Sequence, residues 1–231
     1  MFGFSTLELE ALQISLKVAL WSVTWSFPLA LGTAWLLARK EFRGKAVLNA
    51  VIHVPLVVPP VVIGYLLLVL LGRQGIVGAW LNDWFDVGLV FTWQGAAIAA
   101  SVVAFPLFVR PIRQALEGVD PRLEEAAVTL GADRRQAFFA VTLPIVMPGI
   151  ISGALLFFAR ALGEFGATIT FAANIPGETQ TLPLALYTAT QTPGGDTIAM
   201  RLVLLSLVLA LAALLASEWL SRRSYFQLRG H

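Results

Sequence analysis

The chain has 231 residues, of which 58% are hydrophobic and 13% are charged, and its mean hydropathy is +0.78. Soluble domains carry about a quarter charged residues, so this composition excludes a soluble globular protein and indicates a polytopic membrane protein. The absence of cysteine excludes disulfides, thiolate nucleophiles and cysteine metal sites, and two histidines argue against a histidine metal site. The net charge is +2, and the basic residues flank apolar runs, which gives no support for nucleic-acid binding.

The first apolar run predicts a membrane-spanning helix over residues 12–38. Residues 1–10 contain no Lys or Arg, so they lack the positive region of a secretory signal. Val18–Ala38 carries no charge and is long enough to cross a hydrocarbon core of roughly 30 Å. Pro28 is expected to kink this helix. A tight basic group follows and marks the cytoplasmic side of the membrane: Arg39, Lys40, Arg43 and Lys45.

The second span lies within residues 46–72 and is interrupted by Pro55, Pro59 and Pro60. Each interior proline removes a backbone hydrogen bond and clashes with the preceding turn, so this segment cannot form one regular helix. Broken backbone at membrane depth persists only where protein or a water-filled cavity surrounds it. Residues 55–64 are therefore candidates for lining a translocation pathway, and a kink that serves packing is the equal alternative.

A third uncharged run predicts a helix over residues 87–109, with a further extension past Pro106 to Ala115. The preceding segment 73–86 is polar and aromatic. Its tryptophans suit the belt that aromatic side chains form at a membrane–water interface.

The charged stretch 118–148 combines helical patterning with charge between two apolar runs. Asp120 followed by Pro121 predicts a helix N-cap with proline at the first helical position, and Gly131 is placed to end this helix. A second short helix is predicted from Asp133 to a break at Leu143-Pro144. One face of the first helix carries an apolar stripe: Leu123, Ala126, Ala127 and Leu130. Composition alone fits a solvated loop between two membrane helices equally well.

A fourth apolar run predicts a helix over residues 145–171. Its Gly149 and Gly153 form a GxxxG pattern, which favours close packing against another helix. Arg160 and Glu164 lie four residues apart in this run and can pair on one helix face. An ionisable residue at the centre of an isolated span costs roughly 2.5–3.5 kcal/mol, so neither side chain is expected to face lipid.

Two roles are open for the Arg160–Glu164 pair. It is either an internal salt bridge that holds the bundle together or a partly neutralised cation beside the pathway of an anion. A permeating solute must also leave, so an arginine balanced by a carboxylate suits a pathway better than a bare arginine. The pathway candidates are the prolines of the second span and the residues around this pair: Pro59, Pro60, Arg160, Glu164, Phe165 and Gly166.

The apolar piece 182–189 is too short to span and is predicted to be a surface helix or a re-entrant segment, whereas residues 198–220 form the last predicted span. The loops after the first, third and fifth spans carry four, five and three Lys/Arg residues. Five spans with the N-terminus outside and the C-terminus inside therefore satisfy the positive-inside rule. The sequence predicts an all-α polytopic membrane helix bundle that forms a single domain over residues 1–231.

The charged loop has a further regularity: Glu125-Ala126-Ala127 is followed by Gly131 and then by Val141-Thr142-Leu143-Pro144. This spacing resembles the EAA loop of ABC importer permeases, in which isoleucine usually stands where this chain has Val141. The resemblance implies a cytoplasmic coupling loop over residues 117–144 whose helix docks into a cleft on an ATPase subunit. The residues implied in that contact are Glu124, Glu125, Ala126, Ala127, Gly131, Ala132, Asp133, Arg134, Arg135, Leu143 and Pro144.

Two longer stretches, ALGEFGATITFAANIPGETQTLPLALYTATQTPGGD and HVPLVVPPVVIGYLLLVLLGRQGIVG, resemble the molybdate permease subunits of ABC importers. With the loop, the similarity covers residues 10–220. It implies an inner-membrane homodimer that works by alternating access with two ATPase subunits and an external molybdate-binding protein. Tungstate, a tetrahedral dianion of nearly equal size, is expected to be carried as well. Sulfate permeases share the ALGEFG core, so a sulfate/thiosulfate permease is the alternative.

The resemblance implies a transport subunit and not an enzyme. No GxxxxGK[ST] phosphate-binding loop occurs, so ATP and magnesium are expected on a separate ATPase chain and no cofactor on this one. An intramembrane enzyme is disfavoured because the Arg160–Glu164 pair has no nucleophile, metal cluster or second carboxylate nearby. A stand-alone channel or secondary transporter would not need an EAA loop.

Overall fold

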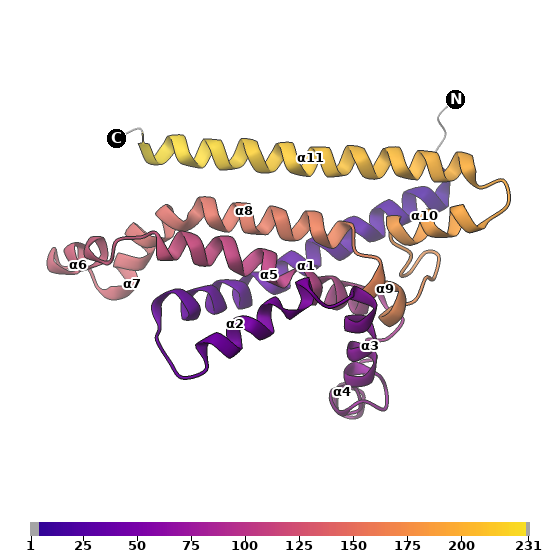
Figure 1. Cartoon of the computed structure of the whole chain (residues 1–231), viewed down its shortest axis with the longest axis horizontal. Coiled ribbons are helices and arrows are strands. Elements are labelled where there is room, and N and C mark those ends of the chain that lie inside the picture. Colours follow the sequence, from indigo (N-terminus) through magenta and orange to yellow (C-terminus); the bar gives the residue numbers. More distant parts are fainter. Residues whose placement is uncertain (1–4, 230–231) are drawn as a thin grey trace.

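The computed structural model describes the backbone of residues 5–229 and the side chains of residues 5–216 and 219. All regular elements in this described part are helices (Figure 1). Four long helices run along the long axis of the molecule: α1 (Thr6–Arg39), α5 (Trp93–Glu117), α8 (Leu143–Leu162) and α11 (Asp196–Arg229). The helix α5 packs against α1 and α8, and α11 lies along α8. The all-α prediction is therefore confirmed for the described residues.

The helix α1 begins at Thr6, earlier than the predicted residue 12, because Ser5 caps it. The Ser5 hydroxyl accepts a hydrogen bond from the Glu8 N–H at 3.3 Å, and the Ser5 N–H donates to Glu8 Oε2 at 2.6 Å. This reciprocal arrangement satisfies two N–H groups that a helix start leaves free. The Glu8 side chain is only 2% exposed, and its Oε1 lies 3.0 Å from Arg201 Nε on α11. An ion pair thus ties the first span to the last.

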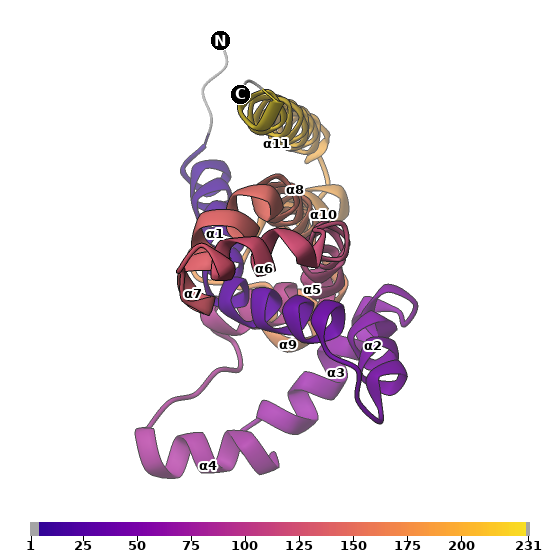
Figure 2. The ribbon, with the colours of Figure 1, turned by 90° about the vertical axis from the view of Figure 1, so that its left-hand side faces the viewer.

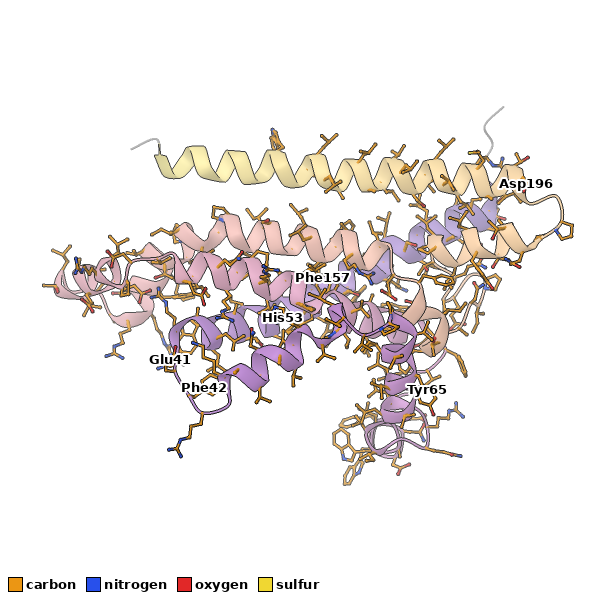
Figure 3. All side chains as sticks on the ribbon, in the orientation of Figure 1. Glu41, Phe42, His53, Tyr65, Phe157 and Asp196 are labelled. Atoms are coloured by element: carbon orange, nitrogen blue, oxygen red, sulfur yellow. The ribbon has the colours of Figure 1, made fainter. Side chains whose placement is uncertain are left out.

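The second span is broken, as its prolines predicted. The helix α2 (Lys45–His53) continues into a 3₁₀ turn, Val54–Leu56, and α3 (Pro60–Leu71) starts after the Pro59 cap. The two parts bend by 112°. The helix α3 then leads into α4 (Ile76–Phe85), and both extend away from the long bundle (Figures 1 and 2). Figure 3 shows Tyr65 out on α3, whereas Phe157 lies within the bundle.

The bundle core lies where α5 packs against α1 on one side and α8 on the other. The helix α5 starts at Trp93, later than the predicted residue 87, because Thr92 caps it by accepting the Gly95 N–H at 3.1 Å. The Phe108 ring of α5 packs against the Phe157 ring of α8 in a tilted arrangement with centroids 5.3 Å apart, and both are fully buried. A Cβ on Gly153 would lie 2.9 Å from the Phe108 carbonyl oxygen. The GxxxG pattern therefore serves close packing against α5, as predicted.

The fourth predicted span differs from the structure at both ends. No break occurs at Leu143-Pro144, because α7 (Arg134–Ala137) continues through a π-helical turn, Phe138–Thr142, directly into α8. In this wider turn the Leu143 N–H donates to the Phe138 carbonyl, which leaves room for the proline ring. At the other end α8 stops at Leu162, and α9 (Gly166–Phe171) follows as a separate helix. The prediction of one helix over residues 145–171 is therefore wrong.

The helix α10 (Leu182–Gln191) has ten residues and is not long enough to span, as predicted. It is not freely exposed on the surface, because Leu182, Ala185 and Ala189 pack in a buried cluster with Ala11 and Leu202. By length and composition, four helical segments of the described chain can cross a membrane, or five if the bent α2–α3 pair counts as one. The side chains of three basic residues used to assign the topology lie outside the described set: Arg222, Arg223 and Arg229.

Candidate coupling loop and translocation pathway

The predicted coupling helix is α6 (Pro121–Thr129), at the end of the molecule opposite α10 (Figure 1). Asp120 caps it by accepting the Arg122 N–H at 3.0 Å, and Pro121 occupies the first helical position. None of its residues is buried, and at the stripe the side chains of Leu123 and Leu130 are 47% and 89% exposed. The described part of the chain therefore leaves Leu123, Ala126 and Leu130 of the apolar stripe exposed, whereas Ala127 is partly buried.

The turn after α6 follows from two local signals. Gly131 has a φ of +97°, which glycine adopts at little cost and other residues rarely adopt, so the helix ends here. Asp133 then caps α7 in a capping box: its Oδ1 accepts the Gln136 N–H at 2.7 Å, and Gln136 Oε1 accepts the Asp133 N–H at 3.0 Å. Both predicted helix boundaries are confirmed. The outward-facing side chains of this loop include Glu125, Ala126, Asp133, Arg134 and Arg135.

Glu124 faces inward, unlike its neighbour Glu125. Its Oε1 accepts a hydrogen bond from Arg39 Nη2 at 3.0 Å and a second, short one from the Thr142 hydroxyl. Arg39 is the last residue of α1, and Thr142 is the buried last residue of the π-helical turn. Sequence reasoning placed Glu124 in the loop contact and missed both partners. The opposite charges of Arg39 at the end of the first span and Glu124 in the loop were the sequence signal for this contact.

The second candidate site is the place where two broken spans meet. The prolines interrupt the chain between α2 and α3, and Gly163–Phe165 interrupts it between α8 and α9. A Cβ on Gly166 would lie 3.0 Å from Pro60 Cβ and 3.2 Å from the Val61 nitrogen. The start of α9 therefore lies directly against the start of α3. Pathway candidates from two distant parts of the sequence, Pro60 and Gly166, are brought together.

Glu164 lies in the break and not within a helix, so its side chain serves two neighbours. Its Oε2 is 2.7 Å from Arg160 Nη1, an ion pair by distance although not a well-aligned hydrogen bond. Its Oε1 accepts the Ala167 N–H at 2.8 Å and so caps the start of α9. The Glu164 side chain is 2% exposed, whereas that of Arg160 is 31% exposed. The pair thus presents a partly neutralised guanidinium beside a helix break.

The remaining pathway candidates lie at the edges of this arrangement. Pro59 caps α3 and is exposed. The Phe165 ring packs on Tyr187 of α10 with centroids 5.4 Å apart, which links the break to the short outer helix. Among the described side chains, no three His, Asp or Glu residues come together in a way that could hold a metal ion.

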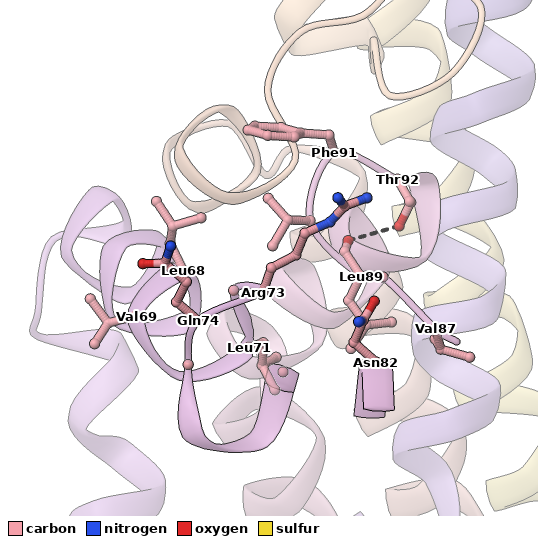
Figure 4. A pocket seen from close by; sticks show the side chains of 15 residues that line it. Leu68, Val69, Leu71, Arg73, Gln74, Asn82, Val87, Leu89, Phe91 and Thr92 are labelled. Atoms are coloured by element: carbon pink, nitrogen blue, oxygen red, sulfur yellow. Dashed lines mark hydrogen bonds between the residues drawn. The ribbon is translucent and has the colours of Figure 1, made fainter. Parts of the chain in front are cut away.

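A pocket of about 970 Å³ lies elsewhere, between the α3–α4 segment and residues 87–92 (Figure 4). It is open, and Arg73 is the charged residue among the described residues that line it. The Thr92 hydroxyl donates to the Leu89 carbonyl at 2.8 Å on one wall. None of the residues predicted to form the pathway lines this pocket, so we do not assign the pathway to it.

A family model described as the binding-protein-dependent transport system inner membrane component matches residues 26–224. This range is most of the chain, and the chain therefore belongs to this family. Members are the multi-pass inner-membrane components of transporters, so the chain is a transport permease and not itself an enzyme.

Individual members of this family can be compared with the chain residue by residue. The molybdenum transport system permease protein ModB of Escherichia coli (strain K12) is 58% identical over 217 residues, which cover 94% of this chain and 95% of that protein. ModB of Haemophilus influenzae is 56% identical over the same shares of both chains. The sulfate transport system permease protein CysW of Synechocystis sp. is 40% identical over 202 residues, 86% of this chain and 73% of CysW.

Two solved structures with a similar fold are chains of ABC transporters. A chain of a bacterial ABC transporter that imports the polysaccharide alginate matches with a TM-score of 0.75 and 19% identity, covering 95% of this chain and 80% of that chain. A chain of the inward-facing methionine transporter MetNI matches with a TM-score of 0.71 and 16% identity, covering 96% of this chain and 99% of that chain. At such identities, the likeness establishes the fold alone.

Proposed function

We propose that this chain is the permease subunit of an ATP-driven importer that moves molybdate, and tungstate with it, into the cytoplasm by alternating access. The observation that carries the proposal is the 58% identity to a molybdenum permease over nearly the whole of both chains. Identity to the sulfate permease CysW is 40% and covers less of that protein. Molybdate and tungstate are both tetrahedral dianions, so a pathway that admits one should admit the other.

The proposed topology has five spans with the N-terminus outside and the C-terminus inside, and the bent α2–α3 pair is its second span. The four basic residues after α1 and the basic loop after α5 support this assignment through the positive-inside rule. The whole chain, residues 1–231, is then one transmembrane domain. Its loop 117–144 faces the cytoplasm.

The proposed assembly contains a second copy of this chain, two ATPase subunits and an extracytoplasmic molybdate-binding protein in the lipid bilayer. Membership in a binding-protein-dependent family supports the ATPase and binding-protein partners. The sequence contains no GxxxxGK[ST] loop, which supports the assignment of ATP and magnesium to the partner ATPase. This chain would contribute the pathway and the mechanical coupling, with no cofactor of its own.

The proposed coupling surface is the outer face of α6 and the turn that follows it. Glu125 and the charged side chains of residues 133–135 would contact the ATPase, and Ala126 and Ala127 are small enough to permit close docking. The uncovered apolar stripe at Leu123 and Leu130 supports a partner at this surface, because solvent-exposed stripes of this kind are typical of binding faces. Leu143 and Pro144, the first two residues of α8, would receive the loop at the start of this span.

The proposed pathway passes the meeting point of the two broken spans. Backbone groups released by the breaks at Pro59-Pro60 and at Glu164 would offer polar partners to a solute at membrane depth. Arg160, balanced by Glu164, would attract an anion without holding it tightly. Phe165 and Gly166 complete this lining.

The test is ATP-dependent uptake of trace molybdate by cells that lack this chain and are then complemented with it. Uptake that is restored by the chain and persists in excess sulfate supports molybdate as the cargo. Uptake abolished by sulfate, with accumulation of sulfate itself, would assign the chain to sulfate transport instead. No ATP-dependent uptake of either anion would contradict the proposed function.

A further inference from the structure

The coupling helix α6 is held to the bundle by few contacts. None of its residues is buried, and its main packing partners are α7 and the adjacent π-helical turn. The one polar side chain that links it to membrane spans is Glu124, among the described residues. One carboxylate oxygen, Oε1, accepts hydrogen bonds from both Arg39 at the end of α1 and Thr142, the residue before α8.

The three residues come from three separate elements: α1, α6 and the π-helical turn. Arg39 and Glu124 are 85 residues apart in sequence, and Glu124 and Thr142 are 18 apart. The side chains of Arg39 and Glu124 are 19% and 35% exposed, and Thr142 is buried at 1%. Partial burial strengthens a charge-assisted contact relative to an exposed ion pair. The carboxylate therefore forms a compact junction between α1, α6 and α8.

The turn that carries Thr142 is itself unusual. Its π-helical hydrogen bond runs from the Leu143 N–H to the Phe138 carbonyl, one residue further back than in an α-helix. Such turns hold an extra residue and occur frequently at functional sites. Without the Glu124 carboxylate, α6 would be joined to α8 through this wide turn and the short helix α7, and its described side chains would make no hydrogen bond to α1.

We propose that Glu124 is a positioning residue that couples displacement of α6 to α1 and α8 together. When the ATPase moves α6, the carboxylate transmits the movement to Arg39 and Thr142 at the same time, so both spans shift as one unit. Glu125 contacts the partner, whereas Glu124 acts within the permease. This inference rests on the proposed function, because it requires an ATPase docked at the coupling loop.

The test uses the full complex of permease and ATPase in vesicles with the binding protein, and it measures molybdate transported per ATP hydrolysed. Glu124→Ala should assemble normally and hydrolyse ATP, but this ratio should fall about tenfold, within the usual range of coupling between sites. Thr142→Val, which removes the hydroxyl at nearly constant volume, should lower the same ratio, and Thr142→Ser should retain it. The double variant Glu124→Ala/Thr142→Val should be no worse than Glu124→Ala alone, because both remove one junction.

The matched control is Glu41→Ala. Glu41 pairs with Lys45 at 2.6 Å beside the same cytoplasmic boundary, but its side chain is 88% exposed and it joins no two spans. This variant should keep the wild-type ratio. If Glu124→Ala fails to accumulate, the exchanged pair Arg39→Glu/Glu124→Arg and the two Thr142 variants decide the question.

The proposed role of Glu124 would be overturned if Glu124→Ala transports as much molybdate per ATP as the wild type. It would also be overturned if Thr142→Val and Thr142→Ser give equal ratios. A merely structural role would lower the amount of complex without changing the molybdate moved per ATP. The proposed function fails separately, when the wild-type complex itself moves no molybdate with ATP.

Discussion

Replacing Glu164 by Gln separates the two contacts that this side chain makes. The Gln amide oxygen can still accept the Ala167 N–H, now 2.8 Å from Glu164 Oε1, so the cap on α9 is kept. The charge that faces Arg160 at 2.7 Å is lost. The variant therefore tests the ion pair with little change in shape.

The expected cost to stability is modest. Hydrogen bonds to charged groups contribute about 1.5–3 kcal/mol and neutral ones about 0.5–1.5, so losing the charge should lower the free energy of unfolding by about 1–2 kcal/mol. The larger penalty for stranding a buried charge does not apply in full, because the Arg160 side chain is 31% exposed and can be solvated. The complex should remain assembled.

The same substitution is expected to change the transport kinetics more than it changes the stability of the complex. If Arg160 faces the anion pathway, its uncompensated charge should bind the dianion more tightly and release it more slowly, so KM and the maximal uptake rate should both fall, each by about tenfold. The assay is molybdate uptake at varied concentration per assembled complex, with the thermal stability of the complex measured in parallel. Glu41→Gln is the control, because Glu41 also has a basic partner four residues away but is 88% exposed.

A Glu164→Gln complex that melts earlier but keeps wild-type KM and maximal rate would refute the pathway role and leave a salt bridge that holds the bundle. Wild-type stability together with wild-type kinetics would refute both roles.

Three other substitutions test different parts of the structure. Gly153→Ala should destabilise the complex by about 1–3 kcal/mol, because the new methyl group would lie 2.9 Å from the Phe108 carbonyl oxygen. Gly32→Ala is the control, because a Cβ at Gly32 would have nothing within 4 Å. Equal melting temperatures for the two variants would contradict the close α5–α8 contact. Glu125→Arg should leave the protein in the membrane but uncouple ATP hydrolysis from uptake. Gly131→Val should have the same effect, because valine is strained at a φ of +97°; wild-type transport in both of these variants would contradict the coupling assignment.

Local chemistry explains which parts of the fold could be predicted from the sequence. The start of α6 at Asp120, its end at Gly131 and the start of α7 at Asp133 each depend on a side chain or a backbone angle within a few residues. The same holds for the break at Pro59, because proline lacks the N–H that a helix needs. Such features are readable without knowledge of the tertiary structure.

The break after α8 depends on distant residues and could not be predicted in the same way. The apolar pattern continues through Gly163 to Phe171, so periodicity predicts one helix. The chain breaks instead where Glu164 caps α9 and Gly166 fits against Pro60, a residue more than a hundred positions earlier. The Arg39–Glu124 contact is hidden for the same reason, since opposite charges 85 residues apart specify no geometry.

The ion pair between Glu8 and Arg201 has a consequence for how the molecule can move. The helices α1 and α11 each have 34 residues, about 51 Å at 1.5 Å per residue, and so are longer than a hydrocarbon core of roughly 30 Å. They are pinned to each other at the N-terminus of both, next to the buried cluster that contains Leu202, whereas the coupling loop lies at the far end of the molecule. In the proposed topology and coupling role, a pivot at this end and a force applied to the loop at the other would turn a small displacement of the loop into a change of angle between α1 and α11, and that change would be widest on the cytoplasmic side.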